Sequence, residues 1–281
     1  MDSALAFLPV ELAGAHVLVT GASRGIGEAM ARHFASAGSR VSVAARSVDA
    51  LATVARDIGG SSYGVDLLDT DEVDALIGRV EADSGPIDVL VNNAGMENTQ
   101  WLHAESVQVL RDVVRLNLEA PIVLTRAVLP GMLGRGRGHL VFTSSLAGTS
   151  AFPGLAAYSA TKAGLNNFAG ALRLELRDTP VGVTLVAPGP IDTRMWDVLE
   201  DTADMQAMLR RLRRLQLIPK KSPDLIGRRT VAAVRNGRRH VRVPRRLSAT
   251  FWLGESPRRI TEALLAKVPM VVPPDPTGPE G

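Results

Sequence analysis

Cysteine is absent from the 281-residue sequence, and aromatic residues make up only 4% of it. Without cysteine there is no disulfide framework, no thiol nucleophile and no cysteine metal cluster, so we expect no metal site. A reducing compartment is permitted, and the cytoplasm is the expected location. The sequence is 46% hydrophobic and contains 26 glycines, which is typical of an α/β protein whose small residues let helices lie close to a sheet.

Long apolar runs are also missing. No stretch of about 18 or more uninterrupted apolar residues occurs, which argues against an ordinary membrane-spanning helix. The first residues, MDSALAFLPVELAGAH, lack a basic region followed by a long apolar run, so we expect no cleaved signal peptide. The sequence predicts a soluble protein.

Positive charge is concentrated near the C-terminal end. The net charge is only +3, yet the segment from Arg210 to Arg246 carries fourteen Arg or Lys residues and one acid, Asp224. Such a segment is usually a solvated face; an anionic lipid surface, an acidic carrier or a phosphorylated substrate are the alternatives. Nucleic acid is not expected as a partner, because the segment has almost no aromatic residues for base stacking.

Apolar runs and helical periodicities alternate along the chain in the order strand, turn, helix. The runs that predict strands lie at 16–20, 41–45, 62–66, 87–93, 139–144, 181–188 and 239–243. The periodicities that predict helices lie at 25–38, 48–58, 70–83, 105–133, 156–178, 223–236 and 256–267. Continuous apolar runs are typical of parallel strands buried on both faces, so the predicted fold class is a doubly wound α/β sheet flanked by helices.

No linker divides the chain. We predict an N-terminal segment at 1–12, a single domain at 13–268 and a disordered Pro/Gly-rich tail at 269–281. Within the domain, residues 194–217 are expected to form a substrate lid. Its apolar candidates for contact with a bulky substrate are Met195, Trp196, Met205, Met208 and Leu209, with ordinary core packing as the alternative for the methionines.

A glycine-rich turn follows the first predicted strand. Residues 20–27 read TGASRGIG, so the glycines stand at a helix N-terminus, where backbone N–H groups and the helix dipole favour a pyrophosphate. The spacing is G-x-x-x-G-x-G, which differs from the common dinucleotide pattern, and a tight turn alone would also need glycine. The position after a strand favours a dinucleotide cofactor.

The end of the second predicted strand bears on which dinucleotide binds. An NAD site commonly has an acid there for the ribose hydroxyls, whereas this chain has Arg46. Arg46, with Arg24 from the glycine turn, would pair with a 2′-phosphate through charge-assisted hydrogen bonds. The sequence therefore favours NADP(H) over NAD(H), although Arg46 is alternatively a surface arginine at a helix start.

Several motifs coincide in one order and spacing: TGASRGIG, Asp66, NNAG at 92–95, Asn117, Ser145, YSATK at 158–162 and PGPIDT at 188–193. Over about two thirds of its length the chain resembles the short-chain dehydrogenase/reductase superfamily. The resemblance implies one Rossmann-type domain with about seven parallel strands and a catalytic tetrad of Asn117, Ser145, Tyr158 and Lys162, in which Asn117 would hold a water that relays protons.

The resemblance also implies contacts with the cofactor. Asp66 and Leu67 would meet the adenine, Asn92, Ala94 and Gly95 the adenine ribose side, and Ile191 and Thr193 the nicotinamide carboxamide. The complete set of expected cofactor-binding residues is Gly21, Ser23, Arg24, Gly25, Ile26, Gly27, Arg46, Asp66, Leu67, Asn92, Ala94, Gly95, Tyr158, Lys162, Pro188, Gly189, Ile191 and Thr193.

Tyr158 and Lys162 lie one helical turn apart. A free tyrosine has a pKa near about 10, so we expect the Lys162 ammonium to lower the pKa of Tyr158 and favour phenolate. Lys162 would also reach the nicotinamide ribose, and Ser145 would stabilise charge on the substrate oxygen. Each of these residues also has an ordinary structural explanation: Tyr158 and Lys162 could lie on a helix surface, and Ser145 could cap a helix. Together they predict hydride transfer between NADP(H) and a carbonyl or secondary alcohol.

Other functions and partners remain open at this stage. A non-catalytic NADP(H)-binding regulator and a reductase of acyl groups on an acidic carrier are the alternatives. The resemblance implies a homo-oligomer, a dimer through helices 105–133 and 156–178 or a tetramer; the Asp-Gly-Gly motif of tetrameric relatives is missing, which puts the tetramer in doubt. Peripheral membrane contact through Phe251, Trp252 and Leu253 is a minor alternative.

Overall fold

Seven parallel strands form one sheet in the order β3-β2-β1-β4-β5-β6-β7. The computed structural model describes residues 9–150, 152–189, 191 and 221–243. The strands are β1 His16–Thr20, β2 Arg40–Ala45, β3 Ser61–Gly64, β4 Val89–Asn92, β5 Gly138–Thr143, β6 Val181–Pro188 and β7 His240–Val243. The chain starts in the middle of the sheet and winds outward in both directions, so the predicted doubly wound, Rossmann-type fold is confirmed.

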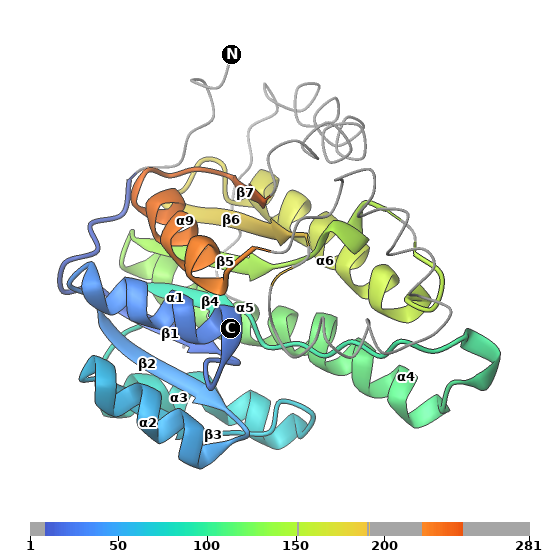
Figure 1. Ribbon diagram of the computed structural model, residues 1–281. Coiled ribbons are helices and arrows are strands. Elements are labelled where there is room, and N and C mark those ends of the chain that lie inside the picture. Colours follow the sequence, from blue (N-terminus) through green and yellow to red (C-terminus); the bar gives the residue numbers. More distant parts are fainter. Residues whose placement is uncertain (1–8, 151, 190, 192–220, 244–281) are drawn as a thin grey trace, which may run out of the picture.

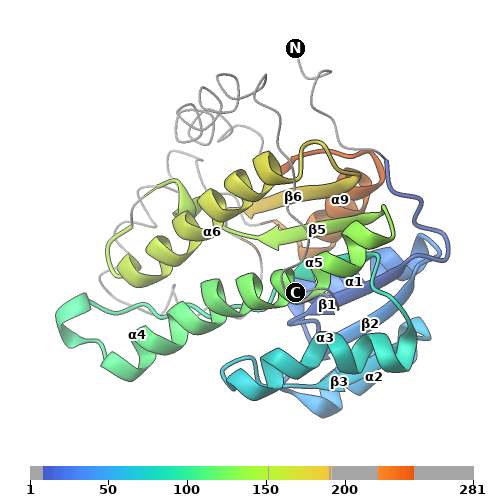
Figure 2. The same ribbon diagram turned by 180° about the vertical axis from the view of Figure 1, so that it is seen from behind.

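Helices cover both faces of this sheet (Figures 1 and 2). One face carries α1 Gly25–Ser36, α2 Val48–Ile58 and α9 Pro223–Arg235. The other carries α3 Thr70–Ser84, α5 Ala120–Gly134 and α6 Ala156–Glu175. α4 Val107–Val114 leads into α5 and projects beyond the sheet (Figure 1), and two short 3₁₀ turns lie at Leu102–Ala104 and Leu146–Gly148.

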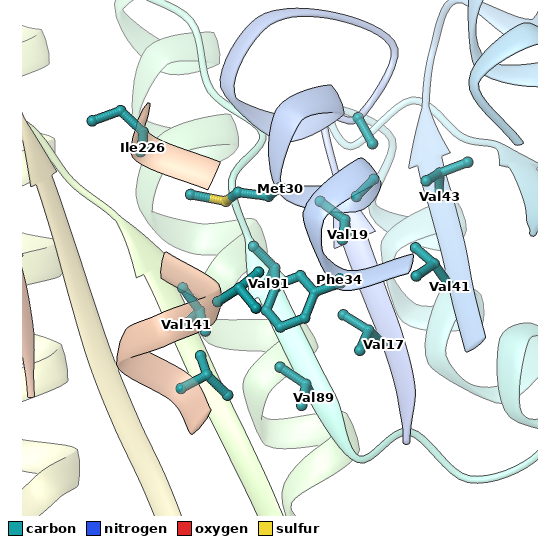
Figure 3. Packing of buried hydrophobic residues seen from close by; sticks show 14 of the residues in the cluster. Val17, Val19, Met30, Phe34, Val41, Val43, Val89, Val91, Val141 and Ile226 are labelled. Atoms are coloured by element: carbon teal, nitrogen blue, oxygen red, sulfur yellow. The ribbon is translucent and has the colours of Figure 1, made fainter. Parts of the chain in front are cut away.

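Alternate residues of the central strands pack into the two hydrophobic cores, one on each face of the sheet. Val17 and Val19 of β1 belong to the cluster under α1, whereas Leu18 between them belongs to the cluster on the opposite face. Phe34 of α1 is fully buried and lies over the valines of β1 and β4 (Figure 3). Because both faces are buried, the carboxyl ends of β1, β4 and β5 are fixed in position along one edge, and the site is built there.

The predicted elements differ from the structure mainly at their ends. β3 ends at Gly64 rather than 66, and it is an edge strand in which only Tyr63 is buried, so the expectation of a strand buried on both faces is wrong there. The helix predicted at 105–133 begins at Val107 and contains a wide π-helical turn, Arg115–Glu119, between α4 and α5. α6 stops at Glu175 rather than 178, and the helix predicted at 223–236 is confirmed as α9. The lid predicted at 194–217 and the helix predicted at 256–267 lie outside the described residues.

By length and composition alone, one helical run in the described ranges, Val107–Gly134, is apolar enough to suit a membrane span. In this fold Leu124, Val128 and Met132 from that run are buried against the sheet. Burial in a core gives a helix the same composition, so the run carries no separate argument for a membrane.

Candidate active site

The glycine turn is a cradle that side chains would fill. Gly21 and Gly25 adopt positive φ angles of 65° and 62°, which favour glycine. A Cβ atom on Gly21 would lie 2.7 Å from the Ala94 Cα, and one on Gly27 would overlap the Gly21 carbonyl oxygen. The first turn of α1 has no side-chain cap at Arg24, so its backbone N–H groups stay available to an anion. These residues fit a dinucleotide pyrophosphate.

Thr20 fastens this turn to the loop that follows β4. Its hydroxyl oxygen accepts hydrogen bonds from the Asn93 and Ala94 backbone N–H groups at 3.0 and 3.1 Å. The Asn93 side chain donates in turn to the Thr20 carbonyl at 3.1 Å. Neither Thr20 nor Asn93 is among the residues that the sequence predicts for the site, although both lie inside its motifs. Their role is to hold the two motifs against each other.

Arg46 and Asp66 lie just beyond the carboxyl ends of β2 and β3. The Arg46 Nη1 is 3.8 Å from Asp66 Oδ2, and the two side chains are 73% and 41% exposed. Asp66 Oδ1 also accepts from the Leu68 backbone N–H at 3.1 Å, and Leu67 is buried. An ion pair between such exposed side chains contributes little free energy, so the Arg46 guanidinium can bind an incoming anion instead.

Asn117 sits in the π-helical turn, fully buried, and is locked to the loop after β4. Its Oδ1 accepts from the Met96 backbone N–H at 2.9 Å, and its Nδ2 donates to the Met96 carbonyl at 2.7 Å. Nδ2 also lies 3.3 Å from the Thr161 hydroxyl on α6. The wide turn thus directs the amide toward the predicted tetrad, as π-helical turns at functional sites commonly do.

The other three predicted tetrad residues meet at the carboxyl end of β5. Tyr158 and Lys162 are buried on α6, and the Lys162 Nζ lies 5.6 Å from the centre of the Tyr158 ring. Nζ donates to the Thr143 carbonyl at 3.0 Å, which fixes the lysine beneath the site. Ser145 hydrogen-bonds the Tyr158 hydroxyl and also accepts from the Ala147 N–H at 3.2 Å. A serine hydroxyl and a phenol therefore converge on one point.

Burial dominates the electrostatics of this group. It raises the pKa of Tyr158 well above its ordinary value, with a further rise from Glu97 and a smaller lowering from the Ser145 hydrogen bond. It lowers the pKa of Lys162 to about 8, opposed by Glu97. The expectation that Lys162 lowers the pKa of Tyr158 is thus wrong for this structure, because desolvation of the phenolate is the largest effect. Burial therefore favours the neutral, protonated phenol of Tyr158.

Glu97 is a titratable residue near the predicted tetrad that the sequence did not reveal. It follows the NNAG motif, and burial raises its pKa to about 8, with an opposing effect from Lys162. One of its carboxyl oxygens, Oε1, is buried and has no hydrogen-bond partner among the described residues. No motif signals it; only its position two residues beyond Gly95 could have suggested a place in the site.

The remaining predicted cofactor residues lie at the carboxyl end of β6. Pro188 ends the strand, and the Gly189 N–H donates to the Val243 carbonyl at 2.7 Å. Ile191 is buried and bridges to Lys221. Thr193 and the predicted lid residues Met195, Trp196, Met205, Met208 and Leu209 lie outside the described residues.

Comparison with known sequences finds proteins that are similar to this chain over the region that forms the site. The model of a family described as short chain dehydrogenase matches residues 15–204. A Drosophila melanogaster protein, dehydrogenase/reductase SDR family protein 7-like, is 34% identical over 86% of this chain and 80% of its own length. The mouse dehydrogenase/reductase SDR family member 7B is 36% identical over 66% of this chain, and the match spans 60% of the mouse protein. The 3-oxoacyl-[acyl-carrier-protein] reductase FabG of Escherichia coli is 34% identical over 67% of this chain and 78% of its own length.

Solved structures agree with this result. A metagenomic short-chain oxidoreductase in complex with NADP has a TM-score of 0.68 and 36% sequence identity, over 83% of this chain and 98% of that one. A short chain dehydrogenase/reductase from Burkholderia phymatum in complex with NAD has a TM-score of 0.76 and 25% identity, over 95% of this chain and 99% of that one. Structural neighbours thus bind either dinucleotide.

Proposed function

Because the chain belongs to the short-chain dehydrogenase/reductase family of oxidoreductases, we propose that it interconverts a carbonyl and a secondary alcohol with NADP(H), with Tyr158 as the acid/base. Reduction is the favoured direction. The observation that carries the proposal is a buried Tyr158 that is hydrogen-bonded to Ser145, with Lys162 beside its ring, at the edge of the sheet that also bears the glycine cradle.

The residues divide the chemistry among themselves. A bound nicotinamide supplies the hydride that reduces the carbonyl carbon. Ser145 orients the substrate oxygen and stabilises the charge that develops on it, and Tyr158 donates its proton to that oxygen. Lys162 remains beside the phenol as a fixed cation, held by the Thr143 carbonyl. Asn117 braces the loop after β4 and would hold a water that relays protons.

A preference for NADP(H) is part of the proposal. Arg46 is exposed where β2 ends, and only one ion pair, with Asp66 at 3.8 Å, is found for it in the described part of the chain. It is therefore placed to exchange that weak contact for a 2′-phosphate, with Arg24 as a second cation. Solved relatives with NADP support the assignment, while a relative with NAD makes it necessary to test both.

A second candidate function is the reduction of acyl groups on an acidic carrier. Two relatives are named as ketoacyl reductases, the E. coli FabG and HetN of Nostoc. In the described part of the basic segment, Arg228, Arg235 and Arg238 are exposed around α9. A carrier substrate would make the reaction strongly salt-dependent, whereas small neutral ketones would show little dependence.

A homodimer through the long helices is proposed as the assembly. Trp101, Leu102, Val107 and Val114 are large apolar side chains that stay exposed along α4 and the segment before it. Such a patch on the projecting part of the molecule is typical of a protein interface. Phe251, Trp252 and Leu253, which the sequence offers as a membrane contact, lie outside the described residues.

The test is oxidation of NADPH, with NADH in parallel, over a panel of aliphatic and aromatic ketones, quinones, steroids, retinoid aldehydes and 3-oxoacyl thioesters. Turnover with NADPH that disappears in Tyr158→Phe, while that variant still binds NADPH, is the expected result. Binding of NADPH without turnover of any carbonyl would instead support a non-catalytic NADP(H)-binding regulator. Faster turnover with NADH would contradict the role given to Arg46.

A further inference from the structure

The loop between β4 and α4 carries two buried oxygen atoms that lack partners. They are Oε1 of Glu97 and Oγ1 of Thr99, and neither has a hydrogen-bond partner among the described residues. Buried polar side-chain atoms in native proteins are nearly always hydrogen-bonded, so each exception calls for an explanation. Glu97 and Thr99 are two residues apart on one loop. If this loop faces a ligand, the ligand would supply the hydrogen-bond partners of both oxygen atoms.

The contacts of the loop place Glu97 beside the reacting groups. The Met96 backbone N–H donates to the Asn117 side-chain Oδ1 at 2.9 Å, and the Asn117 Nδ2 donates to the Met96 carbonyl at 2.7 Å. A Cβ on Gly95 would lie 3.4 Å from the Lys162 Nζ. At the far end of the loop, the Gln100 N–H donates to the Gly154 carbonyl at 3.0 Å, just before α6. The loop therefore spans from the helix of Asn117 to the helix of Tyr158.

Charge interactions locate the carboxyl within that span. Glu97 interacts electrostatically with both Lys162 and Tyr158, the two groups closest to the chemistry. Since the substrate carbonyl must meet Tyr158 and Ser145, the substituents next to that carbonyl are the parts of the substrate that this carboxyl would meet.

The charged and polar groups around Glu97 determine which kind of substrate substituent can bind there. An ammonium group would be attracted by ionised Glu97 but repelled by Lys162, and a carboxylate or phosphate would meet the reverse, so neither charge is favoured by both neighbours. A hydroxyl group suits both protonation states of the carboxyl, because it donates to a carboxylate and accepts from a carboxylic acid. With a pKa of about 8, Glu97 populates both states close to neutral pH. The Thr99 hydroxyl supplies a second donor or acceptor.

We propose that Glu97 is a specificity residue: its free carboxyl oxygen, with the Thr99 hydroxyl two residues farther along the loop, binds a hydroxyl group that the substrate carries next to the carbonyl reduced at Tyr158. The inference rests on the proposed function and narrows its substrate class to hydroxylated carbonyl compounds. An analogue without the hydroxyl leaves a buried carboxyl unpaired, which is the strongest form of discrimination available to a polar pocket.

The test measures binding rather than turnover, so that it does not depend on activity. The Tyr158→Phe protein, saturated with NADPH, is titrated calorimetrically with matched pairs of ketones: 2-hydroxyacetophenone and acetophenone, 2-hydroxycyclohexanone and cyclohexanone, hydroxyacetone and acetone. The same titrations are repeated with Glu97→Leu, Glu97→Gln and Glu119→Gln added. Glu119 is an exposed carboxylate two residues from Asn117 and serves as the matched control.

The hydroxylated member of at least one pair should bind about tenfold to a hundredfold more tightly, the range for a hydrogen bond to a charged group. That ratio should fall to near one in Glu97→Leu, take an intermediate value in Glu97→Gln and stay unchanged in Glu119→Gln. An unchanged ratio in Glu97→Leu, or binding of neither member of any pair, would overturn the inference. If Glu97→Leu does not fold, as judged by its NADPH affinity, Thr99→Val replaces it, and there too the ratio must fall.

Activity of the protein that keeps Tyr158 separates this inference from the proposed function. A hydroxyl preference in binding that disappears in Glu97→Leu supports the inference even when no ketone is reduced, and that absence of turnover would contradict the proposed function alone. Turnover of the plain ketones at the same kcat/KM as their hydroxylated partners would overturn the inference and leave the proposed function standing.

Discussion

The cradle at the start of α1 and the pocket around Tyr158 are built in opposite ways. The cradle is made of backbone: Gly21 and Gly27 leave no room for a Cβ, and Thr20 ties the turn to its neighbour. The pocket is made of buried side chains whose charge states depend on one another, with Tyr158, Lys162 and Glu97 each shifted in pKa mainly by burial. Shape therefore governs the first region, and desolvation governs the second.

This difference predicts how the two regions respond to mutation. A change in the cradle should act through steric overlap and affect cofactor binding and folding together. A change in the pocket should affect rate or pH dependence while leaving the fold intact.

The largest effect is expected in the pocket, from two neighbouring serines. Ser145→Ala removes the hydroxyl that meets Tyr158 and should lower kcat by about 10²–10³, because one donor to the developing charge is lost. Ser144→Ala removes a hydrogen bond to the Lys162 carbonyl at 3.3 Å and should cost only about 1 kcal/mol of stability. Steady-state kinetics and thermal melts of both variants check this contrast, and equal kcat values in the two would refute it.

In the cradle, Gly27→Ala should act on binding and stability at once. Its Cβ would overlap the Gly21 carbonyl oxygen and lie 2.5 Å from Asn93 Nδ2, and backbone cannot move aside cheaply. We expect a cost of about 1–3 kcal/mol, seen as a lower Tm and a weaker NADPH Kd. Gly78→Ala, in the middle of α3 with nothing within 4 Å of the added atom, is the control and should be slightly stabilising. A Gly27→Ala protein with normal Tm and Kd would show that the turn is not tightly packed.

Cofactor choice should respond to Arg46. Arg46→Ser removes the exposed guanidinium next to Asp66 and should lower kcat/KM for NADPH by about tenfold, with little change for NADH, because the lost contact involves a phosphate that NADH lacks. Arg56→Ser, an exposed arginine farther along α2, should leave both values alone. Equal losses with both cofactors would assign Arg46 to folding rather than to discrimination.

A pH-dependent change in stability is predicted for Glu97→Gln. The pKa of Glu97 is raised by burial from 4.5 to about 8, so between these values the folded protein keeps a proton that the unfolded chain releases. Wild-type stability therefore falls as the pH rises through this window, and the variant escapes that fall. The Tm of Glu97→Gln relative to wild type should rise from pH 5 to pH 8 and then level off, with each kcal/mol of stability that the wild type loses appearing as about 2–4 °C.

Thermal melts without cofactor across pH 5 to 9 measure this difference. Glu119→Gln, which changes an exposed carboxylate, should give a flat difference over the same range. A flat difference for Glu97→Gln as well would mean that its carboxyl is not desolvated in the folded protein.

The same contrast explains what the sequence could predict. A glycine-rich turn after a strand and a continuous apolar run each indicate one kind of structure. The turn at 20–27 and the strands β1 and β6 could therefore be located from the sequence alone. The π-helical turn at Asn117 could not, because a single wide turn leaves the helical periodicity almost unchanged.

The charge states of the pocket were also beyond prediction. A tyrosine and a lysine one turn apart suggest a lowered pKa for the phenol, but burial and Glu97 reverse the direction. Burial depends on how α6 packs on the sheet, which no local pattern specifies. Glu97 belongs to no motif. Its buried carboxyl oxygen, which has no hydrogen-bond partner among the described residues, is the feature that marks it as a candidate for substrate binding.

The central claim is that Tyr158 protonates a carbonyl oxygen while a hydride reaches the adjoining carbon. The most direct measurement follows deuterium from NADPH that carries deuterium at both C4 positions of the nicotinamide into the product of any ketone or aldehyde in the panel, by mass spectrometry. The account predicts one deuterium at the carbinol carbon of the alcohol with the intact protein and none with Tyr158→Phe, although both proteins bind NADPH. Tight NADPH binding with no label in any product, or equal labelling by Tyr158→Phe, would contradict it.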